Sequence, residues 1–182
     1  DYLIPNYQDK EDLSKEGAII VAGNLAQEKA GYLYELPVRP AYNLYGVGFD
    51  EARKLSNETY FGSFLPDELP SALEGSFGLV WDGDSSKTCS GVYGEYLRYN
   101  NSHKASLYLA SGFPIIVWGQ SALANFVLEK ECGISIESLL DLEEVLEHLS
   151  QAEYQDLVKN AKAVGQKIRE GSYLLSALQA LN

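Results

Sequence analysis

The sequence predicts an α/β fold, with a doubly wound, mainly parallel sheet, helices on both faces and a helical C-terminal tail. Six short apolar runs follow one another along the chain, and segments with helical signals separate most of them. Several runs are continuously apolar rather than alternating, which is typical of strands that helices cover on both faces of a parallel sheet. Alternation of strands and helices along a chain indicates a doubly wound sheet.

The predicted strands are the apolar runs at residues 18–22, 42–45, 59–61, 77–81, 114–118 and 133–136. The predicted helices between them are 28–36, a short helix opened by Pro66-Asp67-Glu68-Leu69, 102–111 and 121–130. Pro and acidic residues favour the first turn of a helix, where backbone N–H groups lack partners. Gly112, followed closely by Pro114, ends the third helix.

The C-terminal tail is predicted to be helical. Ser150 and Glu153 form a capping box, and an apolar stripe then runs from Tyr154 to Ile168. Gly171 closes this helix, and a further short helix follows. We therefore divide the chain into a boundary segment (1–17), an α/β domain (18–149) and a helical tail packed on that domain (150–182).

Composition excludes several classes of function. The chain has 182 residues and a formal charge of −12, which argues against broad binding to nucleic acid or anionic lipid. No apolar run approaches the ~20 residues of a membrane-spanning helix. The two cysteines lack metal-ligand spacing, so free thiols in a reducing, cytoplasmic compartment are expected. Because the chain begins with Asp and contains no Met, we expect an excised piece of a longer protein.

Candidate binding residues follow the predicted strands, because ligands of parallel sheets bind beyond the carboxyl ends of the strands. After the first strand, Gly23 allows a close turn, Asn24 offers an amide, and Lys29 lies where it can reach a phosphate. An ordinary turn with a solvated Lys29 is the more frequent explanation of this segment on its own.

The start of the helix at 102–111 is a second candidate. Asn101 or Ser102 is a natural N-cap, and first-turn N–H groups are free to bind an anion. Lys104 in this turn opposes the helix dipole unless an anion sits there. Phosphate binding and an ordinary cap with a surface Lys104 are equally well supported by these residues alone. His103 is expected to be packed or exposed rather than catalytic.

The loop after the fourth strand contains Asp82, Gly83 and Asp84. Paired acids hold Mg²⁺ in some sites, but Asp and Gly also form turns for backbone reasons, and we favour the loop-shaping role. The GxG at Gly46 and Gly48 lacks the third glycine of the dinucleotide fingerprint. Neither a P-loop, an HExxH zinc motif nor a GxSxG elbow is present.

Several segments together resemble a known family. They are AGNL at 22–25, Tyr60-x-Gly62, PDELP at 66–70, GLVWDGDS at 78–85, YNNSHK at 99–104 and LYLASGFPIIVW at 107–118. They resemble the C-terminal half of bacterial glucosyltransferase 3-like enzymes, which extend glycans on serine-rich repeat adhesins, and of their galactofuranosyltransferase relatives. The resemblance covers about residues 18–136, and the stretch from Tyr99 to Trp118 is its most specific part.

This resemblance implies a Rossmann-like half of a GT-B glycosyltransferase, which binds a nucleotide-sugar donor, usually UDP-linked. Asn101, Ser102 and Lys104 would contact the diphosphate, with Asn24 and Lys29 nearby and Tyr60 beside the nucleotide. No metal or other cofactor is expected. A separate N-terminal domain would hold the glycan or glycoprotein acceptor and any general base, so the isolated domain is expected to be inactive. Homo-oligomerisation stays open, and catalytic residues are not identified.

We consider two alternatives from other classes. The chain fits a non-catalytic nucleotide- or partner-binding module on the same scaffold, since fold alone does not fix function. Its acidic helices at 137–149 and 151–170 would then offer a partner surface. An epimerase-like sugar-nucleotide enzyme needs a Tyr-x-x-x-Lys pair beside a complete glycine fingerprint, and the sequence lacks both.

Overall fold

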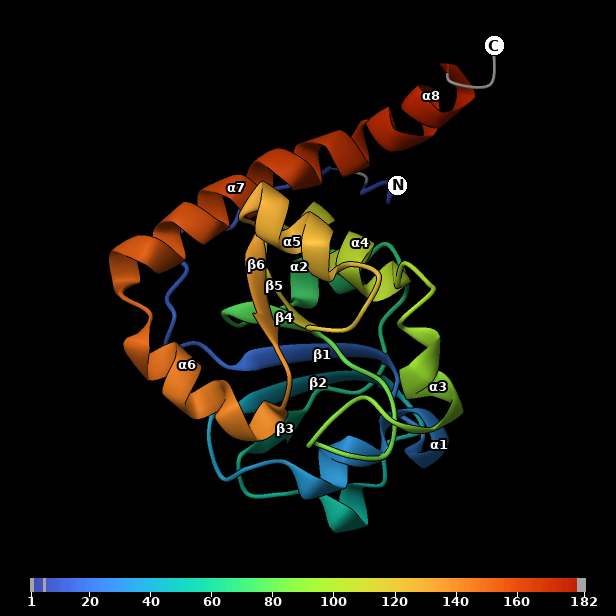
Figure 1. The fold of residues 1–182 in the computed structure, drawn as a ribbon, viewed down its shortest axis with the longest axis vertical. Coiled ribbons are helices and arrows are strands. Elements are labelled where there is room, and N and C mark those ends of the chain that lie inside the picture. Colours follow the sequence, from blue (N-terminus) through green and yellow to red (C-terminus); the bar gives the residue numbers. More distant parts are fainter. Residues whose placement is uncertain (1, 5, 180–182) are drawn as a thin grey trace.

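The computed structural model, which describes residues 2–4 and 6–179, is built on one six-stranded parallel sheet (Figure 1). The strand order is β3-β2-β1-β4-β5-β6, and all neighbouring strands pair in parallel. Every predicted strand is confirmed. The strands are β1 (Ile19–Asn24), β2 (Tyr42–Val47), β3 (Glu58–Tyr60), β4 (Phe77–Val80), β5 (Ile115–Trp118) and β6 (Gly133–Ile136).

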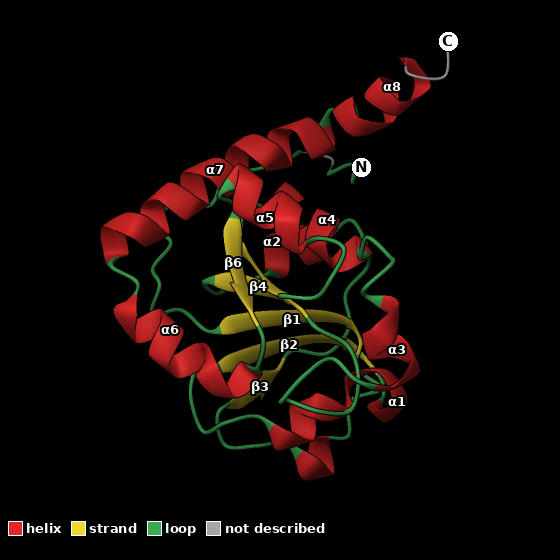
Figure 2. Ribbon diagram, in the orientation of Figure 1, coloured by secondary structure: helices red, strands yellow, loops and turns green. Residues whose placement is uncertain are grey.

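Helices cover both faces of the sheet, as Figure 2 shows. The sheet interior is accordingly apolar: every residue of β4 and β5 is buried, as are the first four residues of β1. This burial explains why these strands read as continuous apolar runs. The α-helices are α1 (Gln27–Ala30), α2 (Leu69–Ala72), α3 (Gly91–Tyr96), α4 (His103–Ala110), α5 (Ala124–Lys130), α6 (Leu142–His148), α7 (Gln151–Arg169) and α8 (Ser172–Gln179).

Two helix predictions were wrong in detail. The predicted helix at 28–36 is the short helix α1 followed by a 3₁₀ helix, η1 (Gly31–Glu35). The helix stops because Ala30 bridges to Gly83, and a Cβ at Gly31 would lie 3.1 Å from Asp84 Cα. Pro66 does not open a helix either. Residues 66–68 form a turn and α2 begins at Leu69, with Pro70 inside its first turn. Two further short 3₁₀ helices are η2 (Glu51–Arg53) and η3 (Leu139–Asp141).

The predicted capping box starts α7. The Ser150 hydroxyl accepts a hydrogen bond from the Glu153 N–H, and the Glu153 carboxylate accepts from the Ser150 N–H at 2.8 Å. The helix then crosses α4 so closely that a Cβ at Gly165 would lie 2.0 Å from the Leu109 carbonyl oxygen. Helix α7 therefore packs directly on α4, and α8 follows after Gly171, whose φ is +71°.

The sheet reverses its direction of growth between β1 and β4. From β1 the chain adds β2 and β3 on one side, and then returns to add β4, β5 and β6 on the other. Such a switch point is where ligands bind in open α/β sheets, beyond the carboxyl ends of the two strands. Here β1 and β4 pair only at Ile19–Phe77 and Ile20–Gly78, so their carboxyl ends are not hydrogen-bonded to each other.

Candidate functional site

Two side chains of α4 lie where β1 and β4 separate. The Tyr108 hydroxyl accepts a hydrogen bond from the Ala22 N–H at 2.7 Å, and its ring packs on Gly78, where a Cβ would lie 2.1 Å from Tyr108 Cγ. Lys104 is one turn earlier on the same helix face. If Gly23, near the end of β1, carried a Cβ, that atom would lie 3.5 Å from Lys104 Cε. Helix α4 thus places an aromatic ring and an ammonium group at the switch point.

Lys104 is fixed by the end of β4. Its Nζ donates to Asp82 Oδ1 at 2.6 Å and to the Trp81 carbonyl at 3.2 Å. The Lys104 and Asp82 side chains are only 10% and 8% exposed, so this is a buried ion pair. Asp82 therefore does more than shape its loop. A lysine in the first turn of a helix is stabilised by a nearby anion. Here that anion is the Asp82 carboxylate of the protein itself.

The loop that carries Asp82 is held by its backbone. Gly83 has a φ of +114°, a conformation that favours glycine, and its N–H donates to the Lys29 carbonyl at 2.7 Å. Asp84 accepts a hydrogen bond from the Ser90 hydroxyl, and Trp81 Nε1 donates to the Ser85 carbonyl. These contacts agree with the turn-forming role predicted for Gly83 and Asp84, and they fix the position of Asp82.

The start of α4 borders an open groove of about 510 Å³. Ser102 is the N-cap, because its hydroxyl accepts from the Lys104 N–H at 3.3 Å. Asn101 is exposed and lines the groove together with Ser102 and His103, opposite residues of α5 and the α7–α8 junction. The groove and the buried Lys104 ammonium are therefore on opposite faces of α4.

The side chains of the other predicted binding residues have partners outside this pair. The Asn24 side chain accepts from the Ala26 N–H at 2.9 Å and closes the turn after β1. Lys29 Nζ lies 5.6 Å from the centre of the Tyr93 ring. Tyr60 ends β3, two strands away from β1, and donates from its hydroxyl to the Gly46 carbonyl at 2.7 Å. Of these three, only Asn24 is on a strand that borders the switch point.

Burial dominates the electrostatics around the pair. Desolvation raises the pKa of the Tyr108 and Tyr32 hydroxyls above the ordinary tyrosine value, and the nearby Asp82 charge contributes in the same direction. Both tyrosines are fully buried and so remain neutral.

Sequence reasoning did not single out Tyr108, although its spacing of four residues from Lys104 placed both on one helix face.

Comparison with known proteins decides the family. The model of the family "Glucosyltransferase 3-like, C-terminal domain" matches residues 19–181. The chain belongs to this family. It is 36% identical over 98% of its length to the beta-1,6-galactofuranosyltransferase WbbI of Escherichia coli (strain K12), and covers 54% of that protein. It is 27% identical over 94% of its length to glucosyltransferase 3 of Streptococcus gordonii, and covers 58% of it. The chain thus spans little more than half the length of these curated relatives.

Solved structures place this glucosyltransferase 3-like domain among GT-B folds. It matches the pneumococcal O-GlcNAc transferase GtfA, solved with UDP and GlcNAc, with a TM-score of 0.54 and 14% identity, covering 98% of this chain and 38% of that one. It matches Anabaena Alr3699/HepE, solved with UDP-glucose, with a TM-score of 0.53 and 10% identity, covering 87% and 48%. At these identities the likeness concerns the fold. Together with the family, it makes the chain a C-terminal domain of a GT-B glycosyltransferase.

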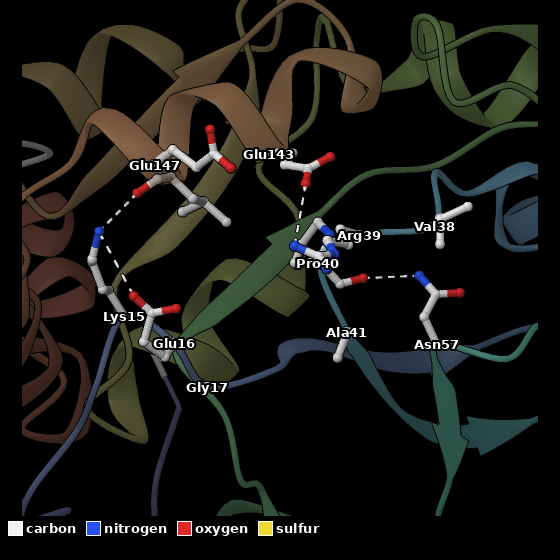
Figure 3. Close-up of a pocket in the computed structure, with 11 residues that line it drawn as sticks. Lys15, Glu16, Gly17, Val38, Arg39, Pro40, Ala41, Asn57, Glu143 and Glu147 are labelled. Carbon is white, nitrogen blue, oxygen red and sulfur yellow. Dashed lines mark hydrogen bonds and ion pairs between the residues drawn. The ribbon is translucent and has the colours of Figure 1, made fainter.

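A pocket of about 520 Å³ lies at the opposite edge of the glucosyltransferase 3-like domain (Figure 3). Among the residues that line it, Ala41 and Asn57 directly precede β2 and β3, and Gly17 lies two residues before β1. Its lysine, Lys15, is engaged, since its Nζ donates to the Leu146 and Leu149 carbonyls at 3.1 and 2.6 Å. In parallel sheets ligands bind at the carboxyl ends of strands, so we do not assign the functional site to this pocket.

In the described part of the chain no three His, Cys, Asp or Glu side chains gather as a metal site would require. Across residues 2–4 and 6–179 no helix has both the length and the apolar character needed to cross a membrane.

Proposed function

We propose that this domain binds the nucleotide-sugar donor of a glycosyltransferase, a UDP-sugar, with the diphosphate at the switch point between β1 and β4. The observation that carries the proposal is the position of Lys104. Its ammonium lies at the end of β4, and its Cε lies beside Gly23 near the end of β1. Lys104 belongs to the first turn of α4, and the N–H groups in the first turn of a helix favour a nearby anion. The relatives' names, and the UDP and UDP-glucose in the two matched structures, support a UDP-linked donor.

The chemistry follows from where charge develops. Breaking the bond between sugar and phosphate leaves negative charge on the departing diphosphate. Preorganised N–H groups at the start of α4 and the Lys104 ammonium stabilise that charge as it forms. Asn101 and Ser102 border the same helix start, and Lys29, Asn24 and Tyr60 would act further along the nucleotide. Because these groups supply positive charge and donors, the proposal uses no metal ion.

The complete enzyme is proposed to transfer glucose or galactofuranose to a glycan or glycoprotein. Its acceptor site and general base would lie on an N-terminal domain outside this chain, so this chain alone would bind donor without transferring sugar. The two buried free thiols fit a reducing compartment, and we place the enzyme in the cytoplasm. A binding module without catalysis would show donor binding but no donor hydrolysis or transfer once the N-terminal domain is supplied.

Titration calorimetry with UDP tests the proposal. Lys104→Met is expected to weaken UDP binding about tenfold to a hundredfold, the range for losing a hydrogen bond to a charged group. Lys159→Met, at an exposed position on α7, removes the same charge and should leave the affinity unchanged. Circular dichroism checks that each variant is folded. Absence of UDP binding to the folded wild-type domain at millimolar concentration would contradict the proposal.

A further inference from the structure

The charge of Lys104 is already balanced in the structure. Its ammonium lies 2.6 Å from Asp82 Oδ1, and both side chains are about nine-tenths buried. An ammonium group has three N–H donors. In the described part of the chain two acceptors engage it, Asp82 Oδ1 and the Trp81 carbonyl. The switch point therefore presents a neutral pair to a ligand rather than a free cation.

A neutral pair poses a problem for an anion-binding site. A phosphate that approaches Lys104 also approaches the carboxylate in contact with it, and like charges a few ångströms apart repel strongly near a protein surface. A buried ion pair is also a weak source of stability, because desolvation offsets the attraction between its members. The position of Asp82 thus calls for a role beyond holding the fold together.

We propose that Asp82 is the resident counter-anion of Lys104, which competes with the incoming diphosphate for the ammonium and so limits the affinity of the site. This inference rests on the proposed function. When a diphosphate binds, the ammonium exchanges its Asp82 contact for a phosphate oxygen. When the diphosphate leaves, Asp82 takes the ammonium back. A site with such a competitor releases its nucleotide product more readily than one with an unpaired lysine.

The geometry suits this exchange. Asp82 is the fixed partner, because the backbone beside it is held by the hydrogen bond from the Gly83 N–H to the Lys29 carbonyl. Lys104 is the movable partner, with a long unbranched side chain. Gly23 has no side chain and leaves the space beside Lys104 Cε open at the end of β1. The ammonium can therefore turn without any backbone movement.

The test compares UDP binding to wild type, Asp82→Asn and Lys104→Met. Asparagine keeps an oxygen acceptor for the ammonium and removes the competing charge. Asp82→Asn is expected to bind UDP about tenfold more tightly, which corresponds to about 1.4 kcal/mol. The gain should disappear in the double variant Asp82→Asn/Lys104→Met, because it acts through the lysine. Asp156→Asn, at an exposed position on α7, removes the same charge and should leave the affinity unchanged.

The outcomes separate this inference from the proposed function. If wild type binds UDP and Lys104→Met weakens it, but Asp82→Asn is weaker or unchanged, then Asp82 has only a positioning role and the inference is overturned. If wild type does not bind UDP, or Lys104→Met has no effect, the proposed function itself fails and takes the inference with it.

A measurement on wild type covers the case in which Asp82→Asn does not fold. Nuclear magnetic resonance detects the scalar coupling between the Lys104 ammonium nitrogen and the Asp82 carboxyl carbon across their hydrogen bond. Saturation with UDP is expected to abolish this coupling. A coupling that persists in the saturated complex would overturn the exchange.

Discussion

At the scale of single residues, the hydroxyl of Tyr108 replaces a strand partner. Strand β1 pairs with β4 only as far as Ile20, and two residues later the Ala22 N–H donates to the Tyr108 hydroxyl instead. A buried backbone N–H without an acceptor is costly. The tyrosine hydroxyl supplies the acceptor that the Ala22 N–H no longer finds on β4 once the two strands separate. On the same face of α4, one turn earlier, Lys104 lies at the strand ends.

Replacing Tyr108 by Phe should therefore destabilise the domain. The ring would still pack on Gly78, but the Ala22 N–H would stay buried without an acceptor, which costs about 1–3 kcal/mol. Urea unfolding followed by circular dichroism measures the loss. Tyr96→Phe, on the exposed side of α3, is the matched control and should leave the midpoint nearly unchanged. Equal midpoints for the two variants would show that the Ala22 N–H finds another acceptor.

The candidate site was predictable in part. A lysine in the first turn of a helix opposes the dipole, and this local rule indicated a nearby anion, which was predicted to be a bound phosphate. It did not identify Asp82 as that anion, because the two residues are 22 positions apart and meet only through the packing of α4 on β4. Similarly, no local pattern shows that Tyr60, on the edge strand, lies two strands from β1. The proposed binding roles of these residues stay predictions.

At the scale of elements, the strands were more predictable than the helices. Burial on both faces forces continuous apolar runs, and the six strands follow those runs closely. Short helices depend on contacts that are distant in sequence. Helix α1 ends at Ala30 because that residue bridges to Gly83, and Pro66 lies in a turn that precedes α2. The long helix α7 was recognised because its capping box and apolar stripe are both local.

The capping box of α7 gives a pH-dependent prediction. Hydrogen bonds from Ser150 hold the pKa of Glu153 below its ordinary value. A depressed pKa in the folded state means that this contribution to stability is present above the unfolded pKa of about 4.3, and is lost as pH falls through the folded value. Glu153→Gln should therefore destabilise the domain at neutral pH, with the difference from wild type shrinking below about pH 4.

Urea unfolding at neutral and acidic pH measures this difference. Asp156→Asn, further along α7 and outside the capping box, is the matched control. A Glu153→Gln effect that is constant from neutral to acidic pH would mean that the charge of Glu153 does not contribute through the cap.

At the scale of the whole molecule, the N-terminal segment ties distant elements together. In Figure 1 it runs beside α7. Lys162 on α7 donates to the Lys10 carbonyl at 2.7 Å and pairs with Asp9 at 3.0 Å. Lys10 in turn donates to the Leu73 carbonyl after α2, at 2.9 Å. The chain's first residues, its middle and its tail are thereby linked, and we expect them to unfold as one unit.

The two thiols report on that cooperativity. Cys89 follows β4 and Cys132 precedes β6, and both are fully buried. Desolvation by burial raises the pKa of the Cys89 thiol to about 12 and that of Cys132 to about 11. Both therefore stay protonated in the native domain at about pH 8, whereas an unfolded thiol has a pKa of about 8.5 and forms the reactive thiolate. Neither thiol should react with a chromogenic disulfide reagent until the domain unfolds.

In a urea series, both thiols should become reactive together, at the midpoint seen by circular dichroism.

The raised thiol pKa values also make the stability of the domain depend on pH. A thiol whose pKa is raised by folding keeps its proton while the unfolded chain loses it, so stability should fall as pH rises above about 8.5. Replacing both cysteines by alanine should remove this part of the alkaline loss. If Cys132 instead reacted at lower urea than Cys89, then the β6 side would open separately, and the domain would unfold in parts rather than as one unit.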